Sequence, residues 1–121
     1  MSQRILVVED QEDNRRILRD LLVASGYELV EATTGEEGLA LAEREIPDLI
    51  LMDIQLPGLD GYEVTRRVKA NPALKHIPII AVTSYALSGD DQKAFAAGCD
   101  GYVTKPFSPR QLLGKIREYL K

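Results

Sequence analysis

The sequence predicts a single α/β domain built on a doubly wound parallel sheet. Strand and helix signals alternate along the whole chain, and the strand signals are short, nearly unbroken apolar runs. Such runs are typical of strands that are buried on both faces, as in parallel sheets. Strands that alternate with helices form open sheets with helices on both sides. We therefore expect strand–helix units joined by short connections, without a linker or an internal repeat.

Most strand signals are short apolar runs, and the second, residues 28–32, has Leu29 and Val30 as apolar residues. Pro78 begins the fourth segment, at a position where the missing backbone N–H of proline does little harm. The expected strands are residues 5–8, 28–32, 49–52, 78–82 and 101–104.

The first two expected helices have clear start and stop signals. The first covers residues 13–25, and Gly26 supplies its stop. Its apolar residues have the spacing of one helical face: Ile17, Leu18, Leu21 and Leu22. Residues 34–37 form a capping box for the second helix, which is expected to run to about Arg44 with Leu39 and Ala42 on its inner side.

The remaining three helices are expected to begin at capping side chains. Asp60 caps a helix that ends near Asn71, and Ser88 caps one that Gly98 stops. Ser108 is expected to cap the last helix, with Pro109 at the first helical position and Gln111 as the capping-box glutamine. The apolar residues that this last helix is expected to bury are Leu112, Leu113, Ile116, Tyr119 and Leu120.

Composition and charge narrow the function classes. The chain has 121 residues and a net charge of -4, without the basic character of nucleic-acid binders. No apolar stretch approaches the roughly 20 residues that span a bilayer, and no signal-peptide segment precedes the first strand. The lone Cys99 forms no internal disulfide and is expected to fill the core as a small apolar residue. We expect a cytoplasmic protein that neither binds nucleic acid nor inserts into a membrane.

Polar side chains stand at the ends of four expected strands. Glu9 and Asp10 follow the first strand, Asp53 follows the third, Thr83 follows the fourth and Lys105 closes the fifth. Parallel strands all end at one edge of a sheet, where doubly wound folds bind their ligands, so these side chains should converge. Crowded carboxylates repel unless a cation is present, and magnesium takes oxygen ligands that phosphate commonly completes. An aspartate can also form an acyl phosphate.

The other strand-end groups fit phosphoryl transfer, which needs mainly positioning and neutralisation of oxygens. Thr83 offers a hydroxyl donor to a phosphoryl oxygen, and Lys105 can pair with a carboxylate or a phosphate as a point charge. The only histidine, His76, is expected in an exposed loop on the edge away from the acids. His76 is therefore not expected to take part in the chemistry at this edge of the sheet.

Several motifs together resemble the receiver domain of bacterial two-component response regulators. The motifs are Val8-Glu9-Asp10, residues 53–63, Val82-Thr83-Ser84 and Lys105-Pro106-Phe107. The chain is most similar to the short, stand-alone receivers of the chemotaxis and cell-division type. The resemblance covers essentially the whole chain and implies one receiver domain over residues 1–121. It also implies a flavodoxin-like fold of five strand–helix units with the strand order 2-1-3-4-5.

The resemblance implies a metal-binding role for the acids. Asp53 would be the phosphoacceptor. Asp10 and Asp53 would ligate Mg²⁺, together with the backbone carbonyl of Gln55, and Mn²⁺ would substitute. Glu9 would act mostly through a bound water. This position is often aspartate in the family, and glutamate is a common departure.

The resemblance also assigns the phosphoryl contacts and the switch. Thr83 would hydrogen-bond the phosphoryl group and Lys105 would form its salt bridge. The Lys105–Pro106 bond resembles the family's cis peptide, a conformation essentially confined to bonds before proline. Tyr102 would be the aromatic switch whose rotamer follows Thr83.

The partners implied are a sensor histidine kinase or a histidine phosphotransfer protein, and a downstream protein. The downstream protein would bind the face made by the fourth helix, fifth strand and fifth helix, where we expect Ala94, Ala97, Tyr102 and Lys115. Because the chain closes with its last helix, output is expected to pass through a partner. A receiver cut from a longer regulator would have the same sequence, so this alternative stays open.

Two other function classes also remain open. A phosphatase of the haloacid dehalogenase type would use an aspartyl nucleophile, but it resembles a pattern with a second acid where this chain has Gln55. A flavodoxin-like cofactor module would place a phosphate-binding loop where Glu9 and Asp10 would repel the phosphate. The leading interpretation is not an enzyme but a phosphoacceptor module that catalyses only its own phosphoryl transfer and dephosphorylation.

Overall fold

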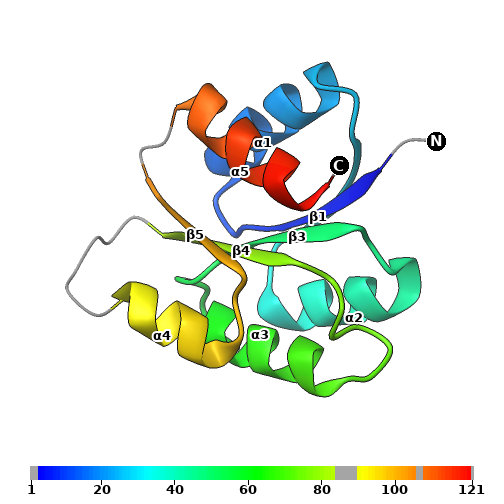
Figure 1. The fold of residues 1–121 in the computed structure, drawn as a ribbon, viewed down its shortest axis with the longest axis vertical. Helices are drawn as coiled ribbons and strands as arrows, with labels where there is room; N and C mark the ends of the chain where they lie inside the picture. Colours follow the sequence, from blue (N-terminus) through cyan, green and yellow to red (C-terminus); the bar gives the residue numbers. More distant parts are fainter. Residues whose placement is uncertain (1–2, 84–89, 106–107, 121) are drawn as a thin grey trace.

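A computed structural model describes residues 3–83, 90–105 and 108–120 of the protein (Figure 1). Its strands form one parallel sheet in the order β2-β1-β3-β4-β5, so the predicted fold class and strand order are confirmed. The strands are β1 (Arg4–Val8), β2 (Glu28–Ala32), β3 (Leu49–Asp53), β4 (Ile79–Thr83) and β5 (Gly101–Thr104). The helices are α1 (Glu12–Ala24), α2 (Gly35–Glu45), α3 (Gly61–Ala70), α4 (Asp90–Ala97) and α5 (Pro109–Tyr119).

Helices cover both faces of the sheet, with α1 and α5 on one face and α2, α3 and α4 on the other (Figure 1). Successive strand residues alternate between the two layers: Ile5 packs into the α1/α5 core and Leu6 into the α2–α4 core. All five residues of β3 and all five of β4 are buried. The near-continuous apolar runs in the sequence reflect this burial on both faces.

The predicted helix caps are confirmed where the structure describes them. Thr34, Asp60 and Ser108 each accept a hydrogen bond from the backbone N–H three residues later, at 3.1, 2.9 and 3.0 Å. The Glu37 carboxylate accepts the N–H of Thr33 at 2.6 Å. In a capping box this carboxylate would instead accept the N–H of the capping residue itself, Thr34. The predicted Ser88 cap of α4 lies outside the described residues.

The buried stripe of α1 is narrower than the sequence predicts. Leu18 and Leu22 are buried, but Ile17, which the helical spacing assigns to the same face, is 59% exposed. One residue corresponds to a rotation of about 100° around a helix, so Ile17 lies beside the stripe that Leu18 and Leu22 form. None of the described helices has the length and apolar character needed to cross a bilayer.

The last helix shows a similar difference between expected and observed burial. Leu112 and Ile116 are buried against the sheet, as predicted. The other apolar residues of this segment are only partly buried at the edge of the same core: Leu113, Tyr119 and Leu120.

The expected membership of the α4–β5–α5 face is wrong in part. Ala94 and Ala97, which we expect at this surface from the resemblance, are both buried, with exposed fractions of 0% and 5%. Their methyl groups point from α4 into the molecule because α4 packs on α3 and β5 with its small residues. Phe95, on the outer side of α4, is exposed instead. Tyr102 and Lys115 are partly exposed, as a place on this face requires.

Candidate functional site

Three carboxylates meet at the carboxyl edge of the sheet. One ligand oxygen each from Glu9, Asp10 and Asp53 lies within 4.8 Å of the others. The parallel pairing of β1 with β3 places these residues together, because Val8 is in register with Met52. Glu9 and Asp53 are buried, whereas Asp10 is half-buried and closer to solvent. The convergence predicted from the strand ends is therefore present.

Lys105 lies across the acids and contacts two of them. Its ammonium donates to Glu9 Oε1 at 2.6 Å and lies 3.8 Å from Asp53 Oδ2. The second carboxylate oxygen of Glu9 accepts a hydrogen bond from the backbone N–H of Gln11 at 3.2 Å. Both oxygens of Glu9 are thus engaged by groups of the protein itself.

The backbone around Asp53 is fixed by its neighbours. Asp53 Oδ1 accepts a hydrogen bond from the N–H of Gln55 at 2.9 Å. At the start of α3, a Cβ added to Gly61 would lie 2.4 Å from the carbonyl oxygen of Asp53. Only glycine allows α3 to pack this closely against the strand end, so Gly61 helps to position Asp53.

Thr83 and Tyr102 project to the same face of the sheet. Thr83 is the buried last residue of β4, and its carbonyl oxygen accepts the N–H of Lys105 at 2.6 Å. In the register of β4 with β5, Thr83 is opposite Thr104, and Tyr102 comes two residues earlier. Tyr102 packs, partly buried, against the α2–α4 core. The predicted cis bond between Lys105 and Pro106 lies outside the described residues, because Pro106 is not among them.

His76 and Cys99 lie away from this chemistry. His76 is exposed in the connection between α3 and β4, as predicted. Cys99 is buried, and its sulfur lies 3.7 Å from the Thr65 hydroxyl. Burial raises the pKa of the Cys99 thiol to about 11, so it stays un-ionised at neutral pH and behaves as an apolar filler.

Sequence reasoning missed Arg15, which contacts the backbone of the site. Arg15, in α1, donates from Nη1 to the carbonyl oxygens of Glu9 at 3.0 Å and Asp10 at 3.2 Å. The chain contains many arginines on helices, and neither periodicity nor spacing distinguishes this one. Its contact depends on how α1 folds back over the loop that precedes it.

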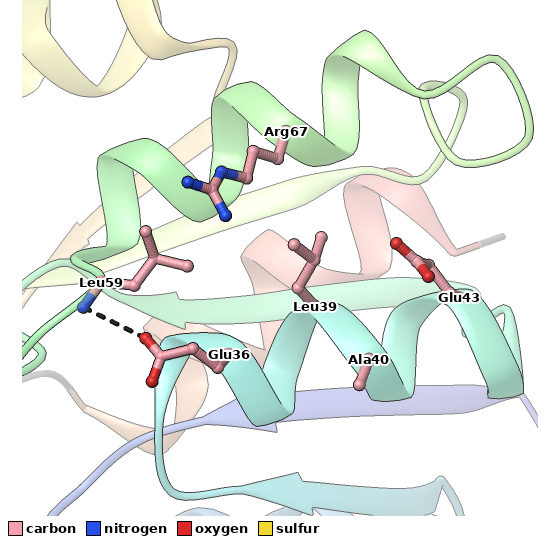
Figure 2. Close-up of a pocket in the computed structure, with 6 residues that line it drawn as sticks. All are labelled: Glu36, Leu39, Ala40, Glu43, Leu59 and Arg67. Atoms are coloured by element: carbon pink, nitrogen blue, oxygen red, sulfur yellow. Dashed lines mark hydrogen bonds between the residues drawn. The ribbon is translucent and has the colours of Figure 1, made fainter.

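A shallow groove between α2 and α3 is separate from the acid cluster (Figure 2). Its volume is about 250 Å³, and it is lined by Glu36, Leu39, Ala40, Glu43, Leu59 and Arg67. The Glu36 carboxylate is directed along the groove and accepts a hydrogen bond from the N–H of Leu59 at 3.2 Å (Figure 2). None of the converging strand-end residues lines this groove.

In magnesium-free buffer, lowering the pH from 7 to 5 is expected to stabilise the wild type relative to Glu9→Gln. Burial, with Asp53 adding to its effect and Lys105 opposing it, raises the pKa of Glu9. The folded state therefore binds a proton at a higher pH than the unfolded state. This contribution to stability is complete at pH values below the pKa of Glu9 in the unfolded protein. It is lost as the pH rises through the pKa of Glu9 in the folded protein.

Urea unfolding of both proteins at several pH values measures this effect. A pKa difference of one unit corresponds to about 1.4 kcal/mol in the free energy of unfolding. Because glutamine does not titrate, the difference between the two proteins isolates Glu9 from the other acids. A stability advantage of the wild type that grows as the pH rises would contradict a raised pKa of Glu9.

The strand order, the acid cluster and the lysine across it are those of a phosphoacceptor module of two-component signalling. A model of the response regulator receiver domain matches residues 5–117. The chain therefore belongs to the response regulator receiver family, and the resemblance drawn from the sequence motifs is confirmed. This match supports the receiver interpretation over a haloacid-dehalogenase-type phosphatase or a flavodoxin-like module.

Relatives and solved structures agree on this class. The polar-differentiation response regulator DivK of Brucella ovis is 46% identical over 99% of this chain and 98% of its own. A putative response regulator from Chloroflexus aurantiacus superposes with a TM-score of 0.95 at 32% identity, covering 99% of this chain and 98% of that one. The receiver domain of a sensor histidine kinase from Pseudomonas aeruginosa has a magnesium ion in its active-site cleft. It superposes with a TM-score of 0.93 at 37% identity, covering 99% of this chain and 98% of that one.

Proposed function

We propose that Asp53 is the phosphoacceptor of this receiver domain. The supporting observation is its position: it is buried at the end of β3, in the cluster with two other carboxylates and 3.8 Å from the ammonium of Lys105. The proposed donor is a phosphohistidine of a sensor histidine kinase or a histidine phosphotransfer protein. The protein would then catalyse only its own phosphorylation and dephosphorylation.

Asp10, Asp53 and the backbone carbonyl of Gln55 are the proposed ligands of Mg²⁺. The donor set fits this ion, because three clustered carboxylates exceed the charge of the one lysine that contacts them in the described part of the chain. Glu9 would reach the ion through water, since both of its oxygens already accept hydrogen bonds. Mn²⁺, which shares the preference for oxygen ligands, is expected to substitute.

The transfer step follows from these positions. A carboxylate oxygen of Asp53 attacks the phosphorus, and an O–P bond forms as the P–N bond of the donor breaks. The imidazole leaves with the electron pair of that bond and takes a proton from solvent. Bound Mg²⁺ would offset the negative charge of the phosphoryl oxygens. Lys105 would shift from Glu9 to pair with one of these oxygens, and the Thr83 hydroxyl would donate to another.

Incubation with acetyl phosphate and Mg²⁺ is expected to give one hydroxylamine-labile phosphoryl group per chain. Such lability is expected of an acyl phosphate, the product that an aspartyl nucleophile forms. Intact-mass spectrometry with and without EDTA measures the adduct and its dependence on metal. Absence of the adduct under both conditions would overturn the proposed function.

Asp10→Ala is expected to weaken Mg²⁺ binding far more than Glu9→Ala. The Asp10 carboxylate would lose a direct metal bond, whereas Glu9 would lose only a contact through water. We expect at least a tenfold increase in the dissociation constant for Asp10→Ala, and a smaller increase for Glu9→Ala. Calorimetric titration of the two variants measures both values, and equal losses would mean that Glu9 is a direct ligand.

We also propose a cytoplasmic site of action and an output surface on the α4–β5–α5 face. Membership of the receiver family supports the location. Phe95 on α4 is 51% exposed, and Tyr102 of β5 and Lys115 of α5 are partly exposed. Exposed aromatic residues are typical of a surface that binds another protein.

A further inference from the structure

Arg15 ties the first turn of α1 to the loop that carries two of the acids. The backbone N–H of Arg15 donates to the carbonyl oxygen of Gln11 at 3.0 Å, which sets the start of the helix. The side chain then turns back, and Nη1 donates to the carbonyl oxygens of both Glu9 and Asp10. Only 15% of the side chain is exposed, so these contacts are largely protected from competition with water.

Glu31 of β2 holds the guanidinium of Arg15 from the other side. Its Oε1 lies 3.6 Å from Arg15 Nε, and both of its oxygens accept hydrogen bonds from Arg19 at 2.8 Å. The hydrogen bond from Arg19 lowers the pKa of Glu31, with Arg15 adding a smaller effect, so Glu31 is ionised at neutral pH. The two arginines and the glutamate link α1, β2 and the loop after β1.

The acid that depends most on this backbone is Asp10. Glu9 is held directly by Lys105 and by the N–H of Gln11. The Asp10 carboxylate is held more loosely, because Gln11 Nε2 reaches its Oδ2 only at 3.4 Å and the side chain is half-buried. The direction of the Asp10 carboxylate therefore follows from its backbone, whose carbonyl Arg15 holds.

We propose that Arg15 is a positioning residue for Mg²⁺ binding: it fixes the backbone of Glu9 and Asp10, and Glu31 fixes Arg15. This inference rests on the proposed function, since it takes the acid cluster as the Mg²⁺ site. Groups that orient metal ligands in this way commonly change affinity by about 10- to 100-fold when they are removed.

Because Arg15 is positively charged, the direction of the change in Mg²⁺ affinity distinguishes a positioning effect from a Coulomb effect. A cation near a metal site repels Mg²⁺, so its removal should tighten binding if only Coulomb forces act. Loss of positioning should weaken binding instead. Arg16 provides a matched control, because it is the next residue of α1, is 60% exposed and pairs with Glu12 at 3.8 Å. Arg16→Met removes the same charge without touching the loop.

The experiment is calorimetric titration of Mg²⁺ into the unphosphorylated full chain. For Arg15→Met we expect a dissociation constant about tenfold higher than that of the wild type. For Arg16→Met we expect an equal or slightly lower one. For Glu31→Gln, which leaves Arg15 in place, we expect a smaller increase, and this increase should disappear in the Arg15→Met background because both changes act on one contact.

Two results overturn the inference. One is an affinity of Arg15→Met equal to or higher than that of the wild type. The other is an equal loss in Arg15→Met and Arg16→Met. Thermal unfolding in EDTA shows whether each variant folds, and if Arg15→Met does not, the Glu31→Gln titration decides. A wild type that binds no Mg²⁺ and forms no phosphoryl adduct would instead overturn the proposed function.

Discussion

Asp53→Asn is expected to abolish phosphorylation by acetyl phosphate and to leave the fold intact. Asparagine keeps the shape of aspartate and its side-chain oxygen, which can still accept the N–H of Gln55. It lacks the carboxylate nucleophile that acyl phosphate formation requires. In metal-free buffer the free energy of unfolding should be unchanged or raised by up to about 1 kcal/mol, because repulsion among the three acids is relieved.

Asp60→Asn is the matched control for this variant. The substitution removes the same negative charge as Asp53→Asn. Asp60 is exposed and caps α3 with its side chain, and asparagine caps helices about as well as aspartate. Phosphorylation of Asp60→Asn should match that of the wild type. Mass spectrometry of digests locates the phosphoryl group, and full incorporation at another residue in Asp53→Asn would show that Asp53 is not the acceptor.

The fold and the convergence of the site follow from sequence because they rest on local and repeated signals. Each buried strand is an apolar run, and the parallel arrangement then places all strand ends at one edge. Glu9, Asp10 and Asp53 therefore meet even though more than 40 residues separate the first from the last. The caps at Thr34, Asp60 and Ser108 are equally local and equally predictable.

What the sequence did not predict depends on packing between elements. Whether Ile17 is buried depends on how α1 is rotated on the sheet, which the periodicity of one helix leaves uncertain by about one residue. The burial of Ala94 and Ala97 depends on the close approach of α4 to its neighbours. The contact of Arg15 with the loop depends on the direction of a long side chain, and no sequence pattern encodes it.

Thr83→Ala is expected to accept phosphate at Asp53 but to lose most of the coupling between phosphorylation and the α4–β5–α5 face. In the proposed switch, the Thr83 hydroxyl moves toward the new phosphoryl oxygens. Thr83 and Tyr102 lie on the same face of adjacent strands, so this movement changes the space available to the Tyr102 ring. Tyr102 is partly buried in β5, an edge strand that packs against α4, and its ring can therefore alter that surface.

The measurement uses beryllofluoride as a phosphoryl mimic and backbone amide resonances as the readout. In the wild type, the mimic should shift resonances in α4, β5 and α5. Thr83→Ala and Tyr102→Ala should still bind it, with shifts near Asp53, but should lose most of the shifts in α4 and α5. Tyr27→Ala is the control, because Tyr27 is a partly buried tyrosine of the opposite core, packed against the α1/α5 layer. It should respond as the wild type does.

The size of the expected effect follows from population shift. If the two surface conformations differ by a few kcal/mol, a phosphoryl group that favours one of them through the Thr83 hydroxyl moves most molecules to it. Without that hydroxyl the differential interaction is lost, and the populations should stay near those of the unmodified protein. Equal shifts in α4 and α5 for the wild type and both variants would rule out the Thr83–Tyr102 route. The phosphorylation chemistry at Asp53 would stand, because it does not depend on this coupling.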